Sequence, residues 1–239
     1  PRDTTSALGK DKLLTWQGQM DASRVEPTIY SALRDSLLHN ILKNNLGDDL
    51  SGLARNPDGR GLGQFLARFK GMLASMIAED NRSMLPLDKD WPEMVADGLA
   101  DGVATLKQRL GDNLDEWRWD ILHQARPKHT LSEAFPELAD LLDPPPIPMN
   151  GDGDTPLAGS YSTADLATVT SLSVARYVYD PSDWNNSMWA VPLGSSGHPG
   201  SPHYHDQSEI WSRVEMAPME YDWDHIVANS ETQQRLDPA

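Results

Sequence analysis

Three consecutive prolines, Pro144 to Pro146, divide the chain into two parts of different character. Proline lacks a backbone N–H group and its ring clashes with the preceding turn, so no helix can run through this triplet. Helical patterns fill the sequence before it, and strand and loop patterns fill the sequence after it. We therefore predict a mainly helical region over 1–143, a Pro/Gly connector over 144–160 and a β-rich segment over 161–239.

Apolar residues at helical spacing fill the first region. One run follows Ser23 and Glu26, which have the spacing of a capping box, and Gly47 is expected to end it. A second run extends from Leu62 to Ile77. We expect the methionines of this second run, Met72 and Met76, to lie in the core.

A third helix is predicted to start at Asp90 and to end before Gly111, because Pro92 and Glu93 suit a first helical turn. Thr130 and Glu133 have the spacing of another capping box.

The helical period disappears after the connector. Thr168 to Tyr179 is rich in Val, Thr, Ser and Tyr, which predicts a strand, and Met188 to Leu193 predicts another. A short helix is expected near Trp211. Helices followed by strands indicate an α+β fold. Two or three strands cannot form a sheet with two covered faces, so we expect the β part to need partner strands from outside this chain.

Charge and cysteine content exclude several functions. Of the 239 residues, 36 are acidic and 20 basic, giving a formal charge of -16, which disfavours nucleic acid and anionic membranes as partners. The absence of cysteine excludes disulfides, thiolate catalysis and cysteine-ligated zinc. The chain begins with Pro1, from which we expect a processed product or a piece of a longer polypeptide.

The loop from Gly194 to Gln207 is rich in His, Ser and Gly. His203 and His205 have the spacing of one strand face, and with His198 they would suit a stand-alone interaction or metal-binding module. The alternative interpretation of this loop is a rigid turn, since it contains two prolines.

A nucleophilic interpretation of the same loop is also open. Ser195 or Ser196 would be the nucleophile, His203 the base and Asp206 the orienting acid. The sequence does not have the strand–turn–helix pattern of a nucleophile elbow, and serines beside glycine commonly bond only local backbone.

Three further groups have simpler explanations. Asp152 to Thr155 resembles a calcium loop only faintly, and we prefer an Asx-rich turn. Trp119 and His123, four residues apart, are predicted to pack in the core. Asp35, Asp48 and Asp49 are expected to be solvated.

Five segments, taken in order along the chain, carry the motifs of a known family. They are Leu14–Gly18, Trp117–Asp120 with His123, Gly151–Thr155, Ser173–Arg176 and Gly194–Gln207. Together they resemble the C-terminal part of the large (beta) subunit of the penicillin acylase (penicillin amidase) family of N-terminal-nucleophile hydrolases. Asp120 and Asn150 stand where that family has glycine. The most specific segment is the last, called here the closing motif: Gly194, Ser196, Gly197, Pro199, Ser201, His203, Tyr204, Asp206 and Gln207.

The resemblance implies an amidohydrolase with an αββα sandwich fold that hydrolyses linear acyl-amine bonds, with antibiotic metabolism as a family role. It implies autoproteolytic processing that creates an N-terminal nucleophile outside this chain, so no catalytic residue, cofactor or metal ligand is assigned here. Calcium ligands of the full enzyme would also lie outside. The implied partners are the upstream part of the large subunit, the small subunit and a small-molecule amide, in a periplasmic or secreted enzyme.

For the closing motif we predict an architectural role. Gly197 and Pro199 would shape a tight loop, while His203, Tyr204 and Asp206 would satisfy buried backbone groups. Asp206→Ala is then expected to lower the yield or maturation of the full enzyme more than the turnover of the molecules that mature.

Overall fold

The computed structural model describes residues 4–55, 63–161, 168–232 and 234–237. By its internal contacts the chain divides into two units, and each unit is made from two segments. Unit 1 comprises Pro1–Arg126 and Pro148–Leu172, and unit 2 comprises Pro127–Ile147 and Ser173–Ala239. The three regions proposed from the sequence stay a prediction about domains.

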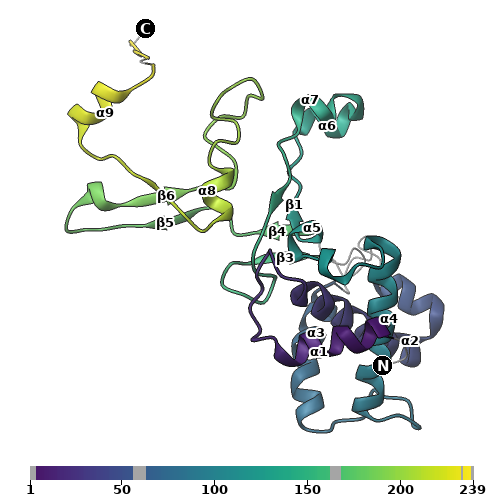
Figure 1. The fold of residues 1–239 in the computed structure, drawn as a ribbon. Coiled ribbons are helices and arrows are strands. Elements are labelled where there is room, and N and C mark those ends of the chain that lie inside the picture. The colour runs from purple at the N-terminus through teal and green to yellow at the C-terminus, as the bar shows by residue number, and fades with distance from the viewer. Residues whose placement is uncertain (1–3, 56–62, 162–167, 233, 238–239) are drawn as a thin grey trace. The chain divides into compact units, whose positions relative to one another are not determined.

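Four helices form most of unit 1. They are α1 (Thr4–Thr15), α2 (Glu26–Arg55), α3 (Gly63–Ala78) and α4 (Trp91–Leu110). Helices α2 and α4 lie side by side (Figure 1). Glycine permits this approach, because a Cβ atom on Gly102 would lie 2.8 Å from the carbonyl oxygen of Ala32.

The predicted ends of α4 are confirmed. Asp90 is the N-cap residue and forms a full capping box with Glu93, and Gly111 ends the helix with a φ of 87°. The predicted break in α2 is also found, since Gly47 has a φ of 76°, although helical residues continue beyond it to Arg55.

Two local predictions in the helical part are wrong. The side chain of Glu26 bonds to the guanidinium of Arg24, and Ser23 bonds to Asp21, so these residues form no capping box together. In α3, Met76 is buried as predicted, but Met72 is 56% exposed. Leu62, where the predicted run begins, lies outside the described residues.

A small sheet follows the helices. Its strands are β1 (Gln124–Ala125), β2 (Ile147–Pro148), β3 (Gly159–Tyr161) and β4 (Val169–Leu172), in the order β2-β1-β4-β3. β1 and β4 are parallel, and β3 and β4 are antiparallel with an irregularity between Ser160 and Tyr161. The short helical segments before β1 are η1 (Leu114–Glu116) and α5 (Trp119–Leu122).

Unit 2 contains a second sheet. Its strands, β5 (Arg176–Val178), β6 (Met188–Ala190) and β7 (Ala217–Pro218), are antiparallel in the order β5-β6-β7. Its helical segments are α6 (Thr130–Ala134), η2 (Pro136–Leu138), α7 (Ala139–Leu142), η3 (Trp184–Asn186), α8 (Ser208–Ser212) and α9 (Trp223–Asn229). The short helix predicted near Trp211 is confirmed as α8.

The single strand predicted over Thr168 to Tyr179 is wrong. It is divided into β4 and β5, which belong to different sheets. The strand predicted over Met188 to Leu193 is confirmed only as far as Ala190. The second predicted capping box is also wrong, because the ring of His129, and not Thr130, accepts the backbone N–H of Leu131 at the start of α6.

The fold is a mixture of helix and sheet, as the sequence predicted. Within the described ranges no helix has both the length and the apolar character needed to cross a bilayer.

Candidate functional site

The closing motif forms a loop in unit 2 that backbone hydrogen bonds hold shut. The N–H of Ser196 donates to the carbonyl oxygen of His203 over 3.0 Å, and the N–H of Gln207 donates to that of Leu193 over 2.8 Å. Inside the loop, the N–H of Ser201 donates to the carbonyl oxygen of His198 over 2.9 Å. The two ends of the motif are therefore joined, one a few residues after β6 and the other directly before α8.

Gly194 makes this closure possible. A Cβ atom at this position would lie 2.1 Å from the carbonyl oxygen of His203 and 2.6 Å from Oδ1 of Asp206, distances that no side chain tolerates. Gly197 differs, since a Cβ atom there would have open space for 4 Å around it. The tightest glycine of the motif is thus the first one.

Two residues of the motif bond to backbone groups outside it. The hydroxyl of Tyr204 donates to the carbonyl oxygen of Leu142 over 2.7 Å, and the residue is 8% exposed. Burial raises the pKa of Tyr204, with a smaller contribution from Asp143. The side-chain oxygen of Gln207 accepts the N–H of Val191 over 3.1 Å. The role predicted for Tyr204 is therefore found, and Gln207, which was not singled out for it, does the same.

The prediction that His203 and Asp206 satisfy buried backbone groups is wrong, because both bond to side chains and their own side chains are 39% and 38% exposed. Nδ1 of His203 lies 2.7 Å from Oδ2 of Asp206, and Nε2 lies 3.1 Å from Oε2 of Glu231. A carboxylate only accepts hydrogen bonds, so both contacts together require the doubly protonated ring. Asp206 first, and then Glu231, raise the pKa of His203 above its ordinary value.

The nucleophilic arrangement is not assembled among the described residues. Oγ of Ser196 accepts the N–H of His198 over 3.2 Å, while carboxylates face both ring nitrogens of His203. The base and acid of the hypothesis are in contact, but the ring has no nitrogen left for a serine.

The metal-binding alternative gains no support either. In the described part of the chain no three His, Asp or Glu side chains converge as a metal site would require. Nδ1 of His198 instead accepts the N–H of Gly200 over 2.9 Å.

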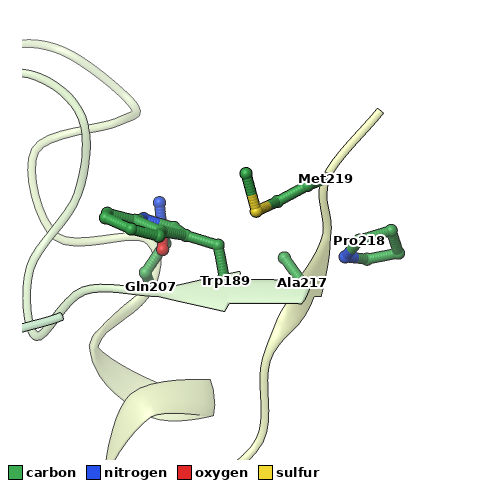
Figure 2. Close-up of a pocket in the computed structure, with 5 residues that line it drawn as sticks. All are labelled: Trp189, Gln207, Ala217, Pro218 and Met219. Carbon is green, nitrogen blue, oxygen red and sulfur yellow. The ribbon is translucent and has the colours of Figure 1, made fainter. Parts of the chain in front are cut away.

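Beside the closing motif lies a cavity of about 360 Å³ that the sequence did not reveal. Figure 2 shows Trp189 and Gln207 at one end of it, Met219 and Pro218 at the other, and Ala217 between them.

From Trp189 a row of ring contacts continues over the sheet. We call these residues the aromatic row: Tyr177, Tyr179, Trp184, Trp189 and Tyr221. Successive ring centroids lie 6.1, 4.9, 6.3 and 5.8 Å apart, starting from Trp189. Tyr177, Tyr179, Trp184 and Tyr221 are between 45% and 67% exposed. The spacing of Tyr177 and Tyr179 could have predicted part of this row from the sequence, because residues two apart in a strand share a face.

A buried ion pair lies in unit 1. Lys70 of α3 contacts Asp35 of α2, and their side chains are 7% and 3% exposed. The lysine ammonium also lies 4.8 Å from the ring centroid of Tyr161, whose hydroxyl is 2.8 Å from Oγ of Ser31. Burial lowers the pKa of Lys70, with Asp35 opposing the effect. The prediction that Asp35 is solvated is therefore wrong, while Asp48 and Asp49 are exposed as expected.

The loop that faintly resembled a calcium site holds a guanidinium. Arg34 lies 3.7 Å from Asp152 and 2.9 Å from Asp154. The N–H of Asp154 donates to Oδ1 of Asp152 over 2.8 Å, which is an Asx turn. The preferred interpretation of this loop is confirmed.

Trp119 and His123 lie in the core, as predicted. Both are fully buried, and their rings stack with centroids 4.5 Å apart. The indole N–H of Trp119 donates to the carbonyl oxygen of Gly151 over 2.9 Å, which ties the tryptophan motif to the Asx turn.

Comparison with known proteins finds a matching family and similar curated proteins. A family described as penicillin amidase matches residues 2–228. Penicillin acylase 2 proenzyme of Pseudomonas sp. (strain SE83) is 34% identical over 96% of this chain and 28% of its own length. Acyl-homoserine lactone acylase QuiP of Pseudomonas aeruginosa is 24% identical over 84% of this chain and 25% of its own length.

A solved structure of a thermostable penicillin G acylase from Alcaligenes faecalis also matches. It is 15% identical with a TM-score of 0.46, and the match covers 100% of this chain and 44% of that one. The chain thus spans about a quarter of the length of the two curated relatives named above.

Proposed function

The chain belongs to the penicillin amidase family, and from that premise we propose that it is the C-terminal part of an amidohydrolase that cleaves linear acyl-amine bonds. The observation that carries the proposal is the match of the family over residues 2–228, nearly the whole chain. The names of the two relatives, penicillin acylase and acyl-homoserine lactone acylase, agree with hydrolysis of an amide between an acyl group and an amine.

The proposed reaction uses a nucleophile outside this chain. The side chain of an N-terminal residue adds to the amide carbonyl, its own α-amine takes the proton, and hydrogen-bond donors stabilise the oxyanion. The amine of the substrate leaves with a proton, and water then releases the acyl group as a carboxylate. We assign none of these steps to residues of this chain, which by itself would be inactive.

The geometry of the closing motif supports this division of roles. Carboxylates face both ring nitrogens of His203, and the Ser196 hydroxyl serves a local turn. Gly194 permits the closure of the loop, and the side chains of Tyr204 and Gln207 tie it to backbone groups outside it. These features indicate an architectural role. We propose that the motif keeps the C-terminal segment in the conformation that assembly of the enzyme requires.

The second sheet supports the proposal that other parts of the enzyme pack here. β5 and β7 are its two edges, and neither edge has a neighbouring strand among the described residues. Tyr177 and Val178, which point to opposite faces of β5, are 55% and 53% exposed. A sheet of three short strands with apolar side chains on both faces needs a cover to be stable.

We propose that this cover is the upstream part of the large subunit together with the small subunit. Together they would complete an αββα sandwich around the β5-β6-β7 sheet. The relatives are about four times as long as the matched region, which leaves ample polypeptide for this role.

Three further features of the whole enzyme are proposals from family membership. Calcium ligands, where the family has them, would lie outside this chain, and Arg34 fills the loop that resembles a calcium site. We place the enzyme in the periplasm or outside the cell. The acyl group that it accepts would be selected by the upstream parts.

The proposal is tested on the protein purified natively from its host. Intact-mass analysis and N-terminal sequencing of every chain that contains or accompanies this segment are expected to find a processed pair. The larger chain would contain this segment and begin with Ser, Thr or Cys. The purified pair should release amine from a panel of acyl amides, and replacing the first residue of the larger chain by Ala should abolish that release.

A single chain of 26.5 kDa that begins at Pro1 and has no partner would overturn the proposal. A processed pair that cleaves esters but no amide would retain the assembly and reject the reaction.

A further inference from the structure

An apolar cavity of about 380 Å³ lies among three helices of unit 1. Its walls come from α1, α2 and α4, with side chains including Leu13, Leu14, Leu33, Val95 and Leu99. Binding sites for small molecules commonly have volumes of about 300 to 1,000 Å³ with mainly apolar walls. The size and the lining of the cavity therefore suit the hydrocarbon part of a small ligand.

One charged residue, Lys10 of α1, lines the cavity. Its side chain is exposed, and none of the ion pairs formed by the described residues involves it. The chain as a whole has a formal charge of -16, so an unpaired ammonium at the rim of an apolar cavity distinguishes this cavity from the rest of the chain. It favours an anionic head group beside the apolar walls.

The carboxylates next in sequence to the lining residues Pro92 and Ala96 serve other groups. Glu93 accepts the backbone N–H of Asp90 in the capping box of α4, and Asp97 pairs with Lys89. Asp11, the neighbour of Lys10, lines a different cavity together with Lys12. The positive charge of Lys10 is therefore not neutralised at the cavity rim.

We propose that this cavity binds an amphipathic carboxylate, with its hydrocarbon chain between α1, α2 and α4 and its head group at Lys10. The site is separate from the proposed hydrolysis, because no step of that reaction is assigned to unit 1. The chemistry of the ligand is that of a medium-chain acyl anion.

The first test is a titration of the natively purified protein by calorimetry with sodium hexanoate, sodium octanoate and 1-octanol. Octanoate is expected to bind with one-to-one stoichiometry. Each added methylene that enters the cavity should strengthen binding about fourfold, so octanoate should bind about 16-fold more tightly than hexanoate. Octanol should bind more weakly than octanoate because it lacks the charge.

Three variants test the contributions of the ligand's charged head group and of its hydrocarbon chain separately. Lys10→Gln should weaken octanoate about two- to fivefold, as expected for an exposed ion pair, and leave octanol unchanged. Ala96→Phe, on the exposed side of α4 at the cavity, should block both ligands. Lys43→Gln, a lysine of α2 that pairs with Asp48 away from the cavity, is the matched control and should change neither.

The position of the ligand is checked independently of affinity. In methyl-labelled protein of the native length, nuclear Overhauser contacts are expected between the octanoate chain and the methyl groups of Val95 and Leu99. Circular dichroism melting of each variant verifies that it folds, and a failure of Ala96→Phe to fold leaves Lys10→Gln and the Overhauser contacts as the deciding data.

Equal binding of octanol and octanoate, no effect of Lys10→Gln, or contacts at other methyl groups would overturn the inference. An absence of binding because another segment fills the cavity would do the same. A processed acylase that binds no octanoate here would reject this inference alone. Binding at the cavity in a protein that hydrolyses no amide would reject only the proposed function.

Discussion

At position 194 the available space admits no side chain, because the carbonyl oxygen of His203 lies where a Cβ atom would stand. Gly194→Ala is therefore expected to destabilise the folded chain by about 3 kcal/mol through overpacking against a backbone atom. Gly197→Ala, in the same loop with open space around it, should cost far less. Urea denaturation of the two variants measures the difference, and equal midpoints would contradict the predicted closure of the loop.

The hydroxyl group of Tyr204 can be removed without changing the rest of the side chain. Tyr204→Phe leaves the carbonyl oxygen of Leu142 without this donor and should lower the free energy of unfolding by about 1.5 kcal/mol. Tyr221→Phe is the control, since this residue is 67% exposed and its hydroxyl makes no hydrogen bond to the described residues. A control that loses as much stability as Tyr204→Phe would show that the bond to Leu142 is not the cause.

His203 makes the C-terminal contact depend on pH. Its pKa in the folded chain is raised, so the stabilisation is complete below the unfolded value of 6.5 and is lost as the pH rises through the higher folded value. Above that range one ring nitrogen no longer donates, and the contact with Glu231 should weaken.

Titration of the imidazole by NMR is expected to give a pKa above 6.5, and Asp206→Asn should bring it down, because Asp206 is the largest cause of the shift. A pKa that stays raised in Asp206→Asn would assign the effect to another group. Glu231→Gln should also lower the pKa, because Glu231 raises it through a hydrogen bond and through its charge.

At the scale of elements, the pair of Lys70 and Asp35 joins α3 to α2 in the interior of unit 1. Lys70→Met alone leaves a buried carboxylate and should cost about 3 to 5 kcal/mol. The double variant Lys70→Met with Asp35→Leu removes both charges and should regain most of that loss. A double-mutant cycle in guanidinium chloride measures the coupling, and strictly additive losses would contradict a direct interaction.

At the scale of the whole molecule, the aromatic row is expected to be covered by the rest of the enzyme. Tyr179→Ser should therefore reduce the yield of processed enzyme several-fold, with near-normal turnover in the molecules that mature. Trp223→Ser is the control, because Trp223 is 74% exposed on α9 and belongs to no ring contact of the row. Normal processing in Tyr179→Ser with lost turnover would place the row in catalysis and not in assembly.

Asp206→Ala tests the closing motif in the same assay. The expected result is again a loss of matured protein greater than the loss of turnover, since Asp206 bonds His203 inside the loop that the motif closes. Parallel effects of this variant and Tyr179→Ser would indicate that both act on assembly.

The sequence by itself determined the features that depend on nearby residues. The residues of a first helical turn and a helix-ending glycine act within a few positions, so Asp90, Glu93 and Gly111 predicted the ends of α4 correctly. Spacing alone was not sufficient for capping boxes, since the two predicted at Ser23 and at Thr130 are not formed. The closing motif was recognised for the same reason, since its residues follow one another at fixed spacing. The Asx turn at Asp152 needed only the backbone two residues away.

Only the tertiary structure decided the features that join distant residues. Val169 and Arg176 belong to one Val- and Thr-rich run, yet they lie in different sheets because their partner strands differ. Asp35 looks like a solvated acid until α3 brings Lys70 against it. The aromatic row is built from four segments of unit 2: β5 with the residue after it, η3, β6 and the segment after β7. Side-chain contacts at long sequence separation follow from the packing of elements, and local patterns carry no information about which elements meet.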